Sequence, residues 1–281
     1  MRKLIYLCFL PILLVSCGDL LQLGIDAAKT AGSIIDDLAL YYRFDGNTDD
    51  SSGNNRDGTQ PGGTPFSHGE SDRFGASNTC AQFINTHMDT GWGSAVEITG
   101  EFTINFWIKP RSSAGPPLPR ATTKMHILGV SRAYEPEVDS PGLYMEIEKP
   151  GATHNLTVAI ADSESFSNKD LVTFNGLWDS IDLATWYMVT IVHKNGLGAD
   201  KIELYINGAK QSPDVSSSGL TYRVDLEDSI FIGGSHINDV GNGDTSYYQM
   251  DFMFIDDFRF YSRALTDRER DALYYERGYT P

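Results

Sequence analysis

The sequence is poor in cysteine and in positive charge. Three cysteines occur among 281 residues, and two of them, Cys8 and Cys17, stand near the N-terminus. Cys80 therefore has no evident partner, and we expect no disulfide framework. Lys and Arg together number 22 against 38 Asp and Glu, so the formal net charge is −16. A surface of this charge repels nucleic acid, which argues against a DNA- or RNA-binding protein.

The sequence also lacks the motifs of several enzyme classes. It has no nucleophile elbow of the form Gly-x-Ser-x-Gly and no phosphate-binding loop, and its histidines show no zinc-ligand spacing. A glycosidase needs two carboxylates about 5–10 Å apart. Glu146 and Glu148 are the nearest candidates, but Pro150 ends their strand and no third acid follows, so we interpret them as a solvated strand face. The sequence thus predicts no catalytic residue.

An apolar run stands at the N-terminus and is too short to anchor the chain across a bilayer. It extends from Leu4 to Val15 after two basic residues, which is typical of an export signal. The run ends in the sequence Leu14-Val15-Ser16-Cys17-Gly18. An apolar residue and a small residue before a cysteine resemble the lipobox of bacterial lipoproteins. This resemblance implies a signal peptide over residues 1–16 and an acylated Cys17 that holds the chain on a lipid bilayer.

The alternative for this segment is an ordinary secretory signal with a chance cysteine. In the lipoprotein interpretation, residues 17–37 form a lipidated tether or a short helix, since Leu20 and Leu23 belong to a set of apolar residues that could share one helical face. We expect a location in the bacterial cell envelope. Gly18 follows the cysteine, which in enterobacteria-like sorting favours the outer membrane or the cell surface.

From residue 38 onward the chain shows the pattern of a single all-β domain. Apolar and polar residues alternate with a period of two in short segments that turn residues separate. The expected strands are Leu38–Asp45, Phe102–Lys109, Leu143–Glu148, Leu156–Ala161, Trp186–His193, Lys201–Ile206, Ser229–Gly233 and Met250–Tyr261. Asn207-Gly208 is a strong hairpin signal, because both residues accept a positive φ. We interpret residues 111–124 as a long irregular loop.

A helix signal lies at the end of this region. Thr266 and Glu269 have the spacing of a capping box, so we expect a helix over Asp267–Tyr275. Strands without helices between them argue for antiparallel sheets. The predicted fold is an all-β, antiparallel two-sheet jelly-roll sandwich over residues 38–281, with a short C-terminal helix.

Five of these segments carry a family resemblance. They are Leu40–Gly46 followed by Asp50–Asn54, Phe102–Pro110, the hairpin of Trp186–Val192 and Leu204–Gly208, Ile230–Gly234 and Ile255–Thr266. In this order they resemble the laminin G-like jelly-roll domain of the concanavalin A-like lectin/glucanase superfamily, over about residues 38–276. Each segment alone is a weak signal, and their common order is a strong one.

The resemblance implies a concanavalin A-like fold and leaves the function open, because the superfamily includes lectins, adhesion modules and glycosidases. The Glu-x-Asp-x-x-Glu pattern of its glucanases is absent. We therefore expect a surface-anchored binding module for carbohydrate or adhesion. A protein–protein or envelope scaffold role is the alternative, and a divergent glycoside hydrolase is less favoured.

An acidic loop follows the first expected strand. Asp45, Asn47 and Asp50 in this loop carry carboxylate and amide oxygens, which are the ligands that calcium prefers. The resemblance implies a calcium ion between this loop and the aspartate that begins the last strand, here Asp256. We therefore expect these four residues to bind a structural calcium.

Asp256 needs a partner in any case. Simple alternation places it on one strand face with Phe254, Phe258 and Phe260, and a carboxylate on an apolar face requires a cation or several N–H groups. Calcium answers that need. The alternative is that Asp256 caps backbone amides or pairs with Arg43, and that the acidic loop is a solvated turn.

Aromatic residues in turn-rich segments are the candidates for ligand contact, because sugar sites pair aromatic faces with amides and carboxylates. These candidates, together with one histidine, are Trp92, Trp178, His236, Tyr247 and Tyr248. Each could instead be a packing residue. Trp107 and Trp186 fall in expected strands, and we assign them to the core.

Overall fold

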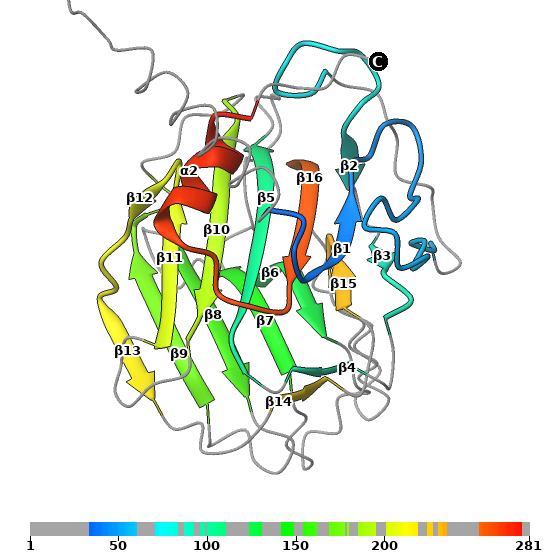
Figure 1. Cartoon of the computed structure of the whole chain (residues 1–281). Coiled ribbons are helices and arrows are strands. Elements are labelled where there is room, and N and C mark those ends of the chain that lie inside the picture. Colours follow the sequence, from blue (N-terminus) through cyan, green and yellow to red (C-terminus); the bar gives the residue numbers. More distant parts are fainter. Residues whose placement is uncertain are drawn as a thin grey trace, which may run out of the picture.

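The computed structural model of the protein describes residues 34–60, 71–83, 87–92, 96–98, 100–110, 124–130, 142–148, 154–161, 169–177, 179, 185–194, 201–218, 224–226, 230–234 and 253–276. In this part of the chain two antiparallel sheets lie face to face, and a short helix covers one of them (Figure 1). The prediction of a two-sheet all-β sandwich with a short C-terminal helix is confirmed.

The first sheet has seven strands. Six of them lie in the order β1 (Leu38–Tyr42), β16 (Met253–Tyr261), β5 (Phe102–Pro110), β10 (Tyr187–His193), β11 (Ile202–Ile206) and β12 (Ala209–Lys210). The seventh, β2 (Ala81–Phe83), pairs with the first residues of β16, whereas β1 pairs with its last residues. The first and last described strands are thus neighbours.

The second sheet also has seven strands. Their order is β13 (Val215–Ser218), β9 (Lys169–Asn175), β8 (Asn155–Ala161), β7 (Gly142–Glu148), β6 (Lys124–Val130), β15 (Ile230–Ile232) and β3 (Met88–Asp89). Two short strands, β4 (Val96–Ile98) and β14 (Val224–Leu226), pair with each other apart from both sheets.

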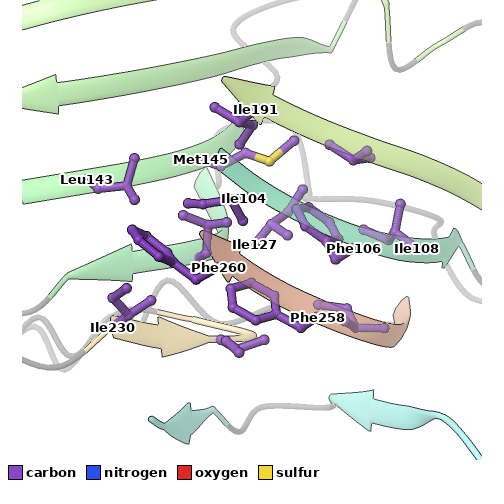
Figure 2. Close-up of a cluster of buried hydrophobic side chains, with 14 of the residues drawn as sticks. Ile104, Phe106, Ile108, Ile127, Leu143, Met145, Ile191, Ile230, Phe258 and Phe260 are labelled. Atoms are coloured by element: carbon purple, nitrogen blue, oxygen red, sulfur yellow. The ribbon is translucent and has the colours of Figure 1, made fainter. Parts of the chain in front are cut away.

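The core fills the space between the sheets. Figure 2 shows Phe106, Phe258 and Phe260 of the first sheet near side chains of the second, among them Leu143 and Met145. All five are at most 1% exposed. Complete burial of such a side chain contributes about 1.5–3 kcal/mol, so these facing layers supply the main driving force for the sandwich.

All of the expected strands are present, but β6 and β9 were missed at the sequence level. In β6 the register shifts between His126 and Leu128, so Ile127 and Leu128 are both buried and the alternation is broken. In β9 a buried polar residue, Asp170, shares the inner face with Val172 and hides the apolar pattern. The irregular loop expected over residues 111–124 therefore meets β6 at Lys124, the first residue of that strand.

Asp170 joins the two sheets through a polar contact. Its Oδ2 lies 3.2 Å from Nε2 of His193 on β10, and its Oδ1 lies 3.6 Å from Nζ of Lys201. His193 also stacks on Phe102, with ring centroids 5.1 Å apart. The interpretation of His193 as a structural residue agrees with this contact.

The strand β16 contains an extra residue. Asp256 lies opposite Trp107 and Arg259 lies opposite Asn105, so two residues of β16 oppose one residue of β5. Asp257 in this bulge has a φ of 49°. A bulge shifts the alternation by one residue, and Asp256 consequently points to the outer face, while the core-facing residues Ile255, Phe258 and Phe260 lie on the inner face. The expectation that Asp256 shares a face with Phe258 and Phe260 was wrong.

The helix α2 (Asp267–Tyr274) lies across the outer face of the first sheet (Figure 1). Its capping box is present, because Thr266 and Glu269 accept hydrogen bonds from each other's backbone N–H groups. Leu265 and Leu273 pack on a second apolar cluster that includes Trp107, Met188 and Tyr261. The first sheet is therefore covered on both faces in this region.

Glu203 on β11 makes several polar contacts with neighbouring residues. Because these contacts favour its ionised form, the stability of the fold at low pH should depend in part on Glu203. Its carboxylate contacts Nζ of Lys194 and of Lys210, each at 2.7 Å, and accepts the Tyr205 hydroxyl at 2.8 Å. Burial alone would raise the pKa of Glu203, but these hydrogen bonds outweigh it and lower the pKa to about 2.

A carboxylate with a lowered pKa in the folded state stabilises the fold above its unfolded pKa, and that contribution disappears as the pH falls toward the folded pKa. We expect Glu203→Gln to cost about 1–2 kcal/mol at pH 7, after allowing for the exposure of both lysines. The cost should shrink between about pH 4.5 and pH 2. Urea unfolding of both chains at several pH values measures this, and a cost that does not depend on pH would contradict the assignment.

Candidate functional site

The acidic loop after β1 does not bring its predicted calcium ligands together. Asp45 is exposed, and its Oδ2 lies 2.7 Å from Nη2 of Arg43. Asn47 is exposed as well, and its Nδ2 donates to Oδ2 of Asp49 at 2.8 Å. Each of these two side chains thus has a partner inside its own loop.

Asp50 fastens the loop to the first strand. Its Oδ1 accepts the backbone N–H groups of Tyr41 at 3.0 Å and Ser52 at 2.9 Å. Its Oδ2 accepts the Ser52 hydroxyl at 2.8 Å and the backbone N–H of Arg56 at 3.1 Å. A carboxylate offers about four lone-pair sites, so these four donors use them and Asp50 acts as a cap for the backbone.

The last predicted ligand, Asp256, lies on β16 in a buried group of charges. Asp256 and its neighbour Asp257 are only 3% and 8% exposed. The Tyr41 hydroxyl donates to Oδ1 of Asp257 at 2.5 Å, and Nη2 of Arg259 lies 3.3 Å from the same oxygen. Nη2 of Arg259 also donates to the Tyr41 hydroxyl at 2.7 Å.

Arg73 reaches the same two carboxylates from a turn 184 residues before Asp257. Its Nη1 forms an ion pair with Asp257 and lies 3.8 Å from Oδ2 of Asp256. Glu276, just after α2, accepts from Arg259 at 2.8 Å and lies 3.4 Å from Nη2 of Arg73. We refer to these residues as the charged network: Tyr41, Arg73, Asp256, Asp257, Arg259 and Glu276.

The two aspartates differ in their acidity. Burial and the adjacent Asp257 raise the pKa of Asp256 well above its usual range. Burial acts in the same direction on Asp257, but Arg259 and Arg73 outweigh it and lower the pKa of Asp257. Burial also raises the pKa of Tyr41, so its hydroxyl keeps its proton and remains a donor. The network therefore has one firmly ionised carboxylate, Asp257, between two guanidinium groups.

The predicted calcium set does not fit this arrangement. The oxygens of Asp50 are used by backbone donors, and Asp45 and Asn47 pair within the loop. Asp256 has the guanidinium group of Arg73 at 3.8 Å from its Oδ2. Within the described ranges, no three His, Cys, Asp or Glu side chains form a group that could hold a metal ion. Calcium binding by these residues remains a prediction, and the geometry of their side chains argues against it.

Of the predicted ligand-contact residues, Trp92 is the one that the structure describes. Its ring is 5% exposed, packs edge-on against Phe260 at 4.7 Å and lies under the Arg56 guanidinium at 4.8 Å. A ring covered in this way belongs to the core and cannot offer its face to a sugar, so the expectation for Trp92 is corrected. Outside the described residues lie Trp178, His236, Tyr247 and Tyr248, as does the lipidation residue Cys17.

Glu146, which the sequence placed on a solvated strand face, is buried. It is 7% exposed, and its Oε2 lies 3.2 Å from Nε2 of His126, whose ring stacks on Tyr144. The side chain of Glu148 is outside the described part. The structure thus adds a His–Glu pair on the outer face of the second sheet, while the two-carboxylate geometry of a glycosidase is not shown.

Aromatic rings gather beside the charged network at the end of α2. Tyr274 stacks on Trp107 with ring centroids 5.9 Å apart, and Tyr275 meets Tyr274 at 5.0 Å. The Arg73 guanidinium lies 4.7 Å from the centroid of Trp107 and 4.2 Å from that of Phe74. Trp186 packs against the same apolar cluster as Trp107.

Two of these rings are clearly open to solvent. Phe74 is 47% exposed and Tyr275 is 75% exposed, while Trp186 and Tyr274 are partly buried. We call Phe74, Trp186, Tyr274 and Tyr275 the ring surface. The sequence analysis missed it, since Trp107 and Trp186 were assigned to the core and nothing in the sequence places Arg73 beside them. The two consecutive tyrosines at the end of the predicted helix were the available signal.

Comparison with known proteins identifies the family. Residues 84–269 match the model of the concanavalin A-like lectin/glucanases superfamily, in its laminin G form. The chain therefore belongs to the concanavalin A-like lectin/glucanases superfamily. A search of curated protein sequences found no significant match.

Solved structures with a similar fold include binding domains of clostridial toxins. The binding domain of botulinum neurotoxin serotype D matches with a TM-score of 0.57 and 18% identity, over 87% of this chain and 52% of that chain. The binding domain of paraclostridial mosquitocidal protein 1 matches with a TM-score of 0.56 and 19% identity, over 86% and 52%. The serotype D domain in complex with N-acetylneuraminic acid matches at 0.52 and 16%, over 87% and 52%. The chain thus spans about half the length of these structures, and the similarity concerns the fold.

Among the described residues, no helix has the length and apolar character to cross a bilayer.

The charged network yields a prediction about stability. Tyr41→Phe removes one hydroxyl and leaves Asp257 and Arg259 each without one hydrogen bond in a buried setting, at an expected cost of about 1–3 kcal/mol. The matched control is Tyr275→Phe at an exposed ring, with an expected change within about 0.5 kcal/mol. Denaturant unfolding compares the two variants, and equal effects would mean that the Tyr41 hydroxyl has no special role.

Proposed function

We propose that this protein is a binding module whose ligand is a carbohydrate and whose contact site is the ring surface. The observation that carries the proposal is the group of partly exposed aromatic rings beside carboxylate and guanidinium groups at the end of α2. Sugars present C–H faces that stack on aromatic rings, and hydroxyl groups that bond to charged side chains.

The charges beside the rings are suitably placed for such contacts. Glu276 follows Tyr275 directly and its side chain remains 32% exposed, so one carboxylate is within reach of a ligand on the rings. Lys109 adds an ammonium group 5.0 Å from the centroid of Trp186. A ligand on this surface would therefore meet rings at its centre and hydrogen-bonding groups at its margin.

The structural relatives support a binding role in general. The botulinum neurotoxin D domain is a receptor-binding domain, and in one complex the serotype D domain holds N-acetylneuraminic acid. A protein ligand is the alternative for this chain. We place carbohydrate first, because a protein interface normally buries a wider surface than four rings provide.

Loss of the most exposed ring should weaken binding with little effect on the fold. A glycan array that includes sialylated oligosaccharides and bacterial polysaccharides identifies the ligand, and calorimetry then measures its affinity. We expect Tyr275→Ala to weaken the affinity about tenfold or more, which corresponds to about 1.4 kcal/mol. The control is Val215→Ala, at another exposed apolar residue on β13. No binding to any glycan, or equal effects of both variants, would refute the proposed site.

The module is proposed to act on the surface of a bacterial cell envelope, held by an acylated Cys17. Two or three acyl chains give a firm anchor, because each buried methylene contributes about 0.8 kcal/mol. Cys17→Ser should release the protein from the membrane fraction and abolish labelling with a fatty acid. Cys80→Ser is the matched control, since Cys80 is buried in the domain and should not affect anchoring. Unchanged labelling of Cys17→Ser would exclude the lipid anchor at this residue.

A further inference from the structure

The outer face of the first sheet carries two adjacent buried aspartates, and any negative charge that they hold requires compensation. Removing a carboxylate from water costs several kcal/mol unless a cation or several donors compensate it. Asp257 has Arg259 on its own strand and the Tyr41 hydroxyl. Asp256 is contacted instead by Arg73, whose Nη1 lies 3.8 Å from its Oδ2.

Arg73 bridges several carboxylate groups, as a bound cation would. One guanidinium group pairs with Asp257, lies 3.8 Å from Asp256 and 3.4 Å from Glu276. It thereby connects the bulge of β16 to the residue after α2. Asp45 and Asp72 lie close enough to this group to interact with it electrostatically.

The surroundings of Arg73 suit a guanidinium group and not a metal ion. Its planar head lies between the rings of Phe74 and Trp107, at 4.2 Å and 4.7 Å from their centroids. Aromatic faces attract a guanidinium group, whereas calcium takes six to eight oxygen ligands. The side chain is only 5% exposed, so this cation is shielded from solvent.

The backbone around Arg73 holds it in this position. Oδ1 of Asp72 accepts the N–H groups of Phe74 at 2.7 Å and Ala76 at 2.9 Å. The Asp72 N–H donates in turn to the carbonyl of Ala76 at 3.0 Å. Gly75 closes the turn with a φ of 87°. The turn therefore presents Arg73 to the sheet with little remaining freedom.

We infer that Arg73 takes the position of the structural cation predicted for this face, so that the charged network is complete without calcium. The family resemblance implies a calcium ion between Asp45 and Asp256, and the guanidinium group of Arg73 supplies this positive charge instead. The fold should then be independent of divalent ions, and the stability of the outer face should depend on Arg73. This inference does not depend on the proposed ligand.

Thermal unfolding of the full-length chain tests the inference. The midpoint of the wild-type protein is expected to stay within about 1 °C in millimolar calcium chloride and in excess EDTA, because the described residues hold no site that links the ion to folding. Arg73→Gln is expected to lower the midpoint by about 6 °C or more, because it leaves buried carboxylates uncompensated. Arg43→Gln, which removes a pair at an exposed side chain, is the control and should change the midpoint by about 1 °C at most.

Two results would overturn the inference. One is a wild-type midpoint that rises by several degrees with calcium or falls with EDTA. The other is an Arg73→Gln midpoint equal to that of the wild type. If Arg73→Gln does not fold, Arg73→Lys replaces it. An ammonium group cannot contact three carboxylates and stack between two rings, so its midpoint should lie below that of the wild type, and an unchanged midpoint would equally reject the role of Arg73.

Discussion

The outer face of the first sheet depends on the extra residue in β16. With Asp257 inserted at a φ of 49°, Ile255 and Phe258 both face the core, and Asp256 and Arg259 both face outward. A regular strand would have sent either the phenylalanines or the charges to the wrong side. One residue in a strained backbone conformation thus allows β16 to serve an apolar core on one face and a charged network on the other.

The separation of an apolar inner face and a charged outer face on β16 explains why the charged residues make so many contacts with protein groups. The network lies in a sheet that α2 and the turn at Arg73 cover, so water cannot compensate Asp256 and Asp257 and protein groups must do so. Groups distant in sequence converge for this purpose: Tyr41 from the first strand, Arg73 from a turn and Glu276 from beyond the last helix. The network therefore ties both ends of the described chain to one strand.

The sequence could predict those features of the fold that depend on local patterns. Alternation predicted the major strands, because one face of each strand is apolar and the pattern is local. The capping box predicted α2 for the same reason. The bulge was not predictable, since the sequence Asp256-Asp257 also fits a regular strand. Regular alternation without the bulge therefore placed Asp256 on the inner face instead of the outer face. The pairing of Arg73 with Asp257 spans 184 residues, and no local signal could reveal it. Trp107 is buried as expected, but it belongs to the second apolar cluster beneath α2, and strand membership does not tell which face a residue joins.

The position of the ring surface follows from this construction. Tyr274 rests on Trp107, Trp107 rests under Arg73, and Arg73 is fixed by the carboxylates of the bulge. Rings with such support lose little conformational freedom when a ligand stacks on them, and binding costs less when the contact groups are already ordered. In this fold the inner faces are fully used by the core, so recognition has to be built on an outer surface. The end of α2 is a surface where the structure supplies both exposed rings and a rigid charged base beneath them.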